Sequence, residues 1–139
     1  MIKKVFLDSD IILDVATGRM PFVEHSKSVL ASIENGKVLG YISSNSIINI
    51  YYILRKISSS TKAKIFIEQL LKYIMVLPVT HDAIIEALKL DFSDFEDAVQ
   101  HQCALANQCE CIITRNEEDY KKSKLNVYNS EEFLALLGN

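Results

Sequence analysis

The sequence lacks the features that mark membrane, secreted or polybasic proteins. No apolar run approaches the roughly 18 residues of a membrane-spanning helix, and no charged segment followed by an apolar one begins the chain. The 15 basic and 18 acidic residues are mixed, so no polybasic tail indicates non-specific nucleic-acid binding. We therefore expect a soluble, cytoplasmic protein with no membrane contact. An acidic centre with local basic patches around it is compatible with this charge.

Cysteine is scarce as well. Cys103, Cys109 and Cys111 are odd in number and clustered, which does not suit a disulfide scaffold. No fourth ligand is spaced to complete a zinc site with Cys109 and Cys111. We interpret all three as small apolar packing residues.

With 139 residues and 49% hydrophobic content, the chain suits one domain, residues 1–139, with one core. Short apolar strands alternate with helical patterns, which predicts an α/β fold with a mostly parallel sheet of about five strands and helices on both faces. The strands are expected over residues 5–7, 38–42, 75–79, 111–114 and 125–128. Three helices are expected over about 22–34, 61–73 and 95–108. A fourth is expected to begin after a cap within 43–46 and to run to about 57. Three more should begin just after residues 8, 80 and 129.

The junction after the first strand is the first candidate for chemistry. The apolar run ends at Asp8, and the apolar residues Ile11 and Ile12 then change to helical spacing. An acid directly after a buried strand is costly to desolvate without a cation or several donors. Asp8 is thus a functional candidate, whereas Ser9 or Asp10 is expected to cap the helix.

Further polar residues follow a later strand or begin a helix. Because parallel strands end at the same sheet edge, Asp8 can meet Asn116 and Asp119, which follow the strand ending at Thr114. Asp94 and Asp97 share one face of the first turn of their helix. Carboxylates brought together repel unless a cation lies among them, and oxygen ligands favour Mg²⁺ or Mn²⁺.

Each of these acids also has an ordinary explanation. Acids in a first helical turn interact favourably with the helix dipole, by about 0.3 to 1 kcal/mol. Asp97, however, precedes a run of small residues that indicates close packing in the middle of the fold. His101, four residues after Asp97, could bind a metal, but a hydrogen-bonding role is the more common one.

Three segments in this order resemble the PIN-domain ribonucleases, which include toxin subunits of type II toxin–antitoxin pairs. They are residues 8–10 (Asp-Ser-Asp), 94–98 (Asp-Phe-Glu-Asp-Ala) and 112–116 (Ile-Ile-Thr-Arg-Asn). The resemblance covers essentially the whole chain and implies a single PIN-like domain. It further implies Mg²⁺- or Mn²⁺-dependent endonucleolytic hydrolysis of RNA and a possible antitoxin partner. Residues 47–54 are apolar nearly all round, which would suit burial in a homodimer or under an antitoxin and equally a helix within the core; we expect a homodimer.

The resemblance also implies roles for individual residues. Asp8 resembles the family's first metal-binding Asp, and Asp97 resembles the acid carried by a helix. The second acid of the family falls at Asn49 and the acid after Thr-Arg falls at Asn116, so two amides replace two carboxylates. An amide oxygen can bind a metal but adds no charge and cannot act as a base.

Other acids can supply the missing carboxylate. Asp119, Asp94 or Glu96 could do so, and we expect one metal ion or a weakly occupied pair. The expected metal ligands are Asp8, Asp97, Asp94 and Asp119, and the expected catalytic residues are Asp8, Asp97, Asn116 and Asp119.

Basic residues near this edge could contact substrate phosphate. Arg115 and Lys121 are the candidates, and Lys122, Lys124, Arg55 and Lys56 could extend a basic rim. Arg115 could instead pair with Glu117 or Glu118 on the surface.

Two other functions remain open. A phosphohydrolase of the haloacid-dehalogenase type also begins with strand-Asp-x-Asp, but Ile11 and Ile12 replace the residues expected after Asp10. A non-catalytic PIN-fold module that binds RNA or protein would explain the amides at Asn49 and Asn116.

Overall fold

A computed structural model of the protein describes residues 1–138. Its centre is one five-stranded sheet in the order β3-β2-β1-β4-β5, and every neighbouring pair of strands is parallel. The predicted α/β class is confirmed. The strands are β1 (Lys4–Leu7), β2 (Leu39–Ser43), β3 (Ile74–Leu77), β4 (Cys111–Ile113) and β5 (Asn126–Tyr128).

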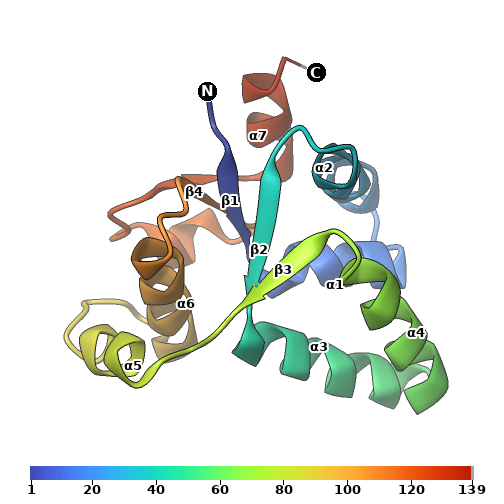
Figure 1. The fold of residues 1–139 in the computed structure, drawn as a ribbon, viewed down its shortest axis with the longest axis horizontal. Helices are drawn as coiled ribbons and strands as arrows, with labels where there is room; N and C mark the ends of the chain where they lie inside the picture. The colour runs from blue at the N-terminus through green and yellow to red at the C-terminus, as the bar shows by residue number, and fades with distance from the viewer. Residues whose placement is uncertain (139) are drawn as a thin grey trace.

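Helices cover both faces of this sheet, with α1, α2 and α4 on one side and α5 and α6 on the other (Figure 1). Their bounds are α1 (Ser9–Thr17), α2 (Val23–Glu34), α3 (Ser44–Ile57), α4 (Ser60–Leu70), α5 (His81–Ala87), α6 (Phe95–Ala106) and α7 (Ser130–Leu136), with a 3-10 turn η1 (Glu117–Tyr120). No helix within residues 1–138 is long and apolar enough to cross a membrane.

The central strand β1 has a core on each face because its side chains alternate. Val5 and Leu7 belong to the larger core, which also includes buried residues of α1 to α4 and α7. Phe6 packs in a second cluster with Cys103 and Ala104 of α6. Small residues on α6 therefore let that helix lie close to the sheet, as the sequence predicted.

The three cysteines confirm their predicted packing role. All three are buried and free. Burial raises the pKa of Cys103 to about 11 and the pKa values of Cys109 and Cys111 to about 12, so the thiols stay protonated at neutral pH.

Two helix ends differ from their predicted positions. The helix predicted over 61–73 ends at Leu70, since residues 71–73 form the turn into β3. The helix predicted over 95–108 ends at Ala106, where the Asn107 side chain donates to the Cys103 carbonyl at 2.8 Å. Neither change moves the parallel strand ends, so the residues after β1, β2 and β4 still meet at one edge.

Candidate metal and active site

Asp8 lies at this edge, where β1 ends and α1 begins. The residue is still extended (φ −71°, ψ 151°), so its Oδ1 accepts from the Ser9 backbone N–H at 2.8 Å. Asp8 is therefore the helix cap, and the prediction that Ser9 or Asp10 caps was wrong. Its Oδ2 accepts from the Thr114 hydroxyl at 2.8 Å, and only 7% of the residue is exposed.

A second carboxylate reaches this centre from α6. The buried Tyr120 hydroxyl donates to Asp97 Oδ1 at 3.3 Å. The Gln100 amide, one turn after Asp97, donates to Asp8 Oδ1 and to the Tyr120 oxygen, each at 3.3 Å. Two neutral side chains thus connect Asp8 with Asp97.

The orientation of Gln100 is fixed from α3. Its Oε1 accepts from the Ser46 hydroxyl at 2.6 Å, and that hydroxyl accepts in turn from Ser43, which caps α3. With the amide oxygen facing Ser46, the Gln100 NH₂ group faces the carboxylates. In this series of hydrogen bonds, from Ser43 through Ser46 and Gln100 to Tyr120, each donor is therefore directed toward Asp8 or Asp97.

The two carboxylates have raised pKa values. Burial is the main cause for Asp8, against the lowering effect of its hydrogen bonds. Burial, followed by the charges of Asp8, Asp94 and Asp119, raises the pKa of Asp97 to about 7. Within residues 1–138, no Lys or Arg forms an ion pair with Asp8 or Asp97, and none is among the main causes of either shift. The negative charge here is uncompensated by the protein.

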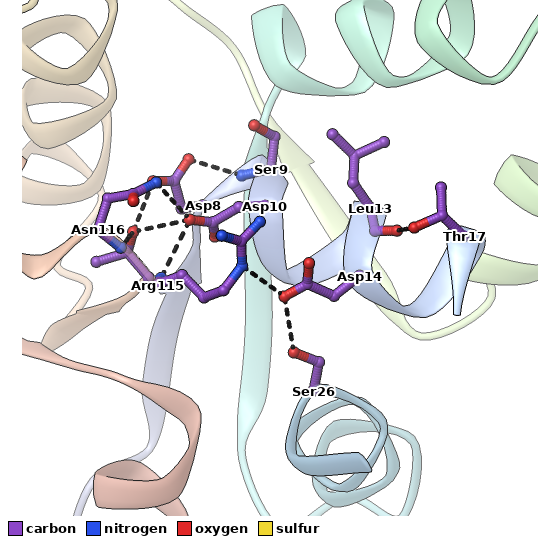
Figure 2. A network of polar contacts seen from close by, with 10 residues as sticks. Asp8, Ser9, Asp10, Leu13, Asp14, Thr17, Ser26, Arg115 and Asn116 are labelled. Atoms are coloured by element: carbon purple, nitrogen blue, oxygen red, sulfur yellow. Dashed lines mark hydrogen bonds and ion pairs between the residues drawn. The ribbon is translucent and has the colours of Figure 1, made fainter. Parts of the chain in front are cut away.

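The neighbouring acids on α1 are paired differently (Figure 2). Asp14 is fully buried, and its Oδ2 accepts from Arg115 Nε at 2.9 Å. Asp10 Oδ2 accepts from the Arg115 backbone and from Asn116 Nδ2, each at 3.1 Å. The guanidinium also lies 4.6 Å from the Phe22 ring centre. Neither predicted surface partner of Arg115, Glu117 or Glu118, binds it.

The other predicted residues lie around this edge in less central positions. Asp94 caps α6, accepting from the Asp97 N–H at 3.0 Å, and Asp119 is exposed on η1. Asn49 is exposed and its amide donates to Glu96 Oε2 at 3.2 Å, so Glu96 is bonded to α3 and not to the groups around Asp8 and Asp97. Helix α3 reaches the centre through Ser46 instead. Lys121 pairs with Glu118 at 3.4 Å on the surface.

His101 has the structural role that the sequence favoured. It is buried, its Nε2 accepts from the Lys124 N–H at 3.0 Å, and its Nδ1 lies 3.1 Å from Gln102 Oε1. Burial lowers its pKa, so the ring stays neutral and holds the segment before β5.

Sequence reasoning missed Gln100, Tyr120 and Ser46. One signal was available: Gln100 is three residues after Asp97 and shares its helix face, amid buried small residues. For Tyr120 and Ser46 the sequence offers no comparable signal, because their contacts join separate elements.

The donor set determines whether a divalent ion fits. Within residues 1–138, no three His, Cys, Asp or Glu side chains lie close enough to form a metal site alone. Mg²⁺, however, is commonly held by one or two carboxylates while keeping several waters. Asp8 and Asp97 fit such an ion, because its charge would lower the raised pKa values of both carboxyl groups.

The chain belongs to the PIN domain family, whose model matches residues 4–118. Membership confirms the resemblance seen in the sequence, and nothing in the fold or the comparisons supports a phosphohydrolase of the haloacid-dehalogenase type.

Particular relatives agree with this. The chain is 26% identical over 136 residues to ribonuclease VapC1 of Aquifex aeolicus, covering 94% of this chain and 93% of that protein. DNA-bound VapBC of Salmonella typhimurium has a similar fold, with a TM-score of 0.70 and 16% identity. The match covers 94% of this chain and 99% of that chain. A toxin–antitoxin complex of Klebsiella pneumoniae has a TM-score of 0.68 and 18% identity, and the match covers 91% of this chain and 97% of that chain.

Proposed function

We propose that this protein is an endoribonuclease that uses Mg²⁺ or Mn²⁺ to hydrolyse RNA phosphodiester bonds. The observation that carries the proposal is the pair Asp8 and Asp97, held together without a basic partner at the C-terminal edge of the sheet. The ribonuclease VapC1 relative supports the same class of reaction.

In this proposal Asp8 and Asp97 hold the ion, and Asp119 and Asp94 contribute negative charge around it. The bound ion would lower the pKa of a water molecule and stabilise charge developing on the phosphate. Gln100 and Tyr120 keep the two carboxylates in place by neutral hydrogen bonds.

The remaining predicted residues act more indirectly. Asn116 orients Asp10, which fixes the loop after β4, so Asn116 supports the site without contacting the ion. Arg115 is anchored through Nε, which leaves its terminal nitrogens to meet a phosphate. Lys121 would contact the RNA backbone from the exposed surface.

We further propose that the protein is a cytoplasmic toxin that forms a homodimer and binds an antitoxin. The support is the fold, which it shares with a toxin–antitoxin complex and with VapBC. Exposed apolar side chains on α3, such as Tyr52, Ile53 and Ile57, offer surface for such contacts.

The test is cleavage of a mixed RNA pool by the purified protein with Mn²⁺, with Mg²⁺ and with chelator. Asp8→Ala and Asp97→Asn serve as site variants, and Glu86→Gln on α5 serves as a surface control. Cuts that need metal and disappear in both site variants support the proposal. If neither cleavage nor metal binding is found, the non-catalytic module, which the exposed amide at Asn49 favours, is the better description.

A further inference from the structure

A cleft of about 420 Å³ lies between α3, α5 and the start of α6, the helix that carries Asp97. Its apolar wall includes Ile48, Ile84 and Phe95, which are 56%, 40% and 51% exposed. Large apolar side chains gathered around a cleft are typical of a ligand surface, and the volume suits a small organic group. Phe95 and Glu96 lie in the first turn of α6, as does Asp97, so the cleft and the acidic pair are carried by the same end of this helix.

One charged group at the cleft has a fixed orientation. Glu96 Oε2 accepts from Asn49 Nδ2 at 3.2 Å and from Asn45 Nδ2 at 3.4 Å. No other group within residues 1–138 donates to this carboxylate, so Oε1 is available to a ligand. The cleft therefore combines an aromatic face, an oriented carboxylate and the Asn45 amide.

We infer that this cleft binds an unstacked guanine base of the RNA substrate, next to the phosphodiester that the Asp8 and Asp97 centre cleaves. The inference rests on the proposed function. Guanine presents two adjacent N–H donors, N1–H and N2–H₂, beside the acceptor O6. A carboxylate can accept both N–H groups, and an amide N–H can donate to O6.

The other bases do not match this arrangement. Adenine and cytosine each present one donor beside a ring nitrogen acceptor, and uracil places its single N–H between two carbonyl groups. The Glu96 carboxylate would accept from both guanine donors. The Asn45 amide, which makes the longer of the two bonds to Glu96, would donate to O6 instead, and the Asn49 amide would keep the carboxylate in place. Phe95 supplies the stacking face that unpaired RNA bases prefer.

Binding of mononucleotides without metal tests the cleft apart from catalysis. GMP, AMP, CMP and UMP are titrated in chelator and followed by chemical-shift changes. We expect GMP to bind at least about tenfold more tightly than AMP, in line with one good pair of base contacts. Glu96→Gln should remove this preference, whereas Glu86→Gln, the same change of charge on α5, should keep it. Phe95→Ala should weaken all four nucleotides and Phe95→Tyr should not.

Cleavage mapping then separates the two proposals. With Mn²⁺, cuts should cluster at one position relative to guanine, and Glu96→Gln should relax that preference while cutting continues. Cutting without base preference, with equal binding of GMP and AMP, would overturn the guanine cleft and leave the nuclease standing. Selective GMP binding by a protein that cuts no RNA would support the cleft and contradict the nuclease.

A second copy of the chain is the rival occupant of this apolar surface. The mass in solution of wild type and Phe95→Ala decides between them. If Phe95→Ala separates a dimer and leaves base preference unchanged, the cleft is an interface between copies and the inference is wrong.

Discussion

Two acidic regions lie next to each other at the C-terminal edge of the sheet, and only one contains its own positive charge. Asp14 is buried and bonded to Arg115 at 2.9 Å, so this carboxylate has a positively charged partner within the chain. Asp8 and Asp97 receive only neutral or backbone donors, and their pKa values are raised by burial. The difference indicates that the first region holds the loop after β4 in place, while the second fits a cation from outside.

The largest expected effect comes from removing one charge of the uncompensated pair. Asp97→Asn should lower RNA cleavage by more than the roughly 10- to 100-fold that an outer-shell residue costs. Because repulsion from Asp8 is relieved, the metal-free variant should melt at the same or a higher temperature, and Mn²⁺ should no longer stabilise it. A large drop in the metal-free melting temperature would show that Asp97 is a structural acid.

Breaking the compensated pair should affect stability. Arg115→Met leaves Asp14 buried without its partner. Because Arg115 is 21% exposed, we expect a loss of roughly 2 to 4 kcal/mol in the free energy of unfolding, somewhat below a fully buried pair. Denaturant titration measures it. The double variant Arg115→Met, Asp14→Leu should recover most of the loss, and an unrecovered loss would argue against a pairwise effect.

A smaller effect is expected from the neutral donors of the uncompensated pair. Tyr120→Phe removes the hydroxyl that donates to Asp97 Oδ1 and keeps the buried ring. We expect about tenfold weaker Mn²⁺ binding, measured by electron paramagnetic resonance, with little change in metal-free melting. Tyr128→Phe on β5 is the matched control. Equal Mn²⁺ affinities in both variants would mean that Tyr120 only packs.

The pH dependence of stability should also reflect the uncompensated pair. The pKa of Asp97 is about 7 in the folded protein against an ordinary value of 3.8, so the folded state binds more protons between these values. Stability of the metal-free protein should therefore fall as pH rises from about 4 to 7. Thermal melts in chelator should show a shallower fall for Asp97→Asn. An identical slope in both proteins would place the responsible proton elsewhere, with Asp10 the next candidate.

Much of the fold followed from local patterns. Alternation of apolar strands with amphipathic helices predicted the parallel sheet, and the position of Asp8 after β1 predicted its place at the edge. Asp97 could be predicted because small residues on its helix indicated close packing. Helix ends were less predictable, since the turn into β3 and the Asn107 side chain decide them.

The contacts of single polar groups needed the tertiary structure. Asn49 occupies the position where the resemblance places the family's second acid, but its side chain on α3 donates a hydrogen bond to Glu96 on α6. Arg115 is followed closely in sequence by Glu117 and Glu118. Only the fold shows that it pairs with Asp14, 101 positions away. Such choices depend on the relative rotation of packed helices, which sequence spacing does not specify.

The amino-acid sequence by itself therefore determined the α/β class, the parallel sheet edge and the two carboxylates nearest its centre, because hydrophobic periodicity and strand ends are local properties. Only the tertiary structure decided which acids are compensated, that Gln100 and Tyr120 connect Asp8 with Asp97, and that Glu96 faces a cleft. The physical reason is that hydrogen bonds and charge compensation depend on ångström-scale distances between elements far apart in the chain.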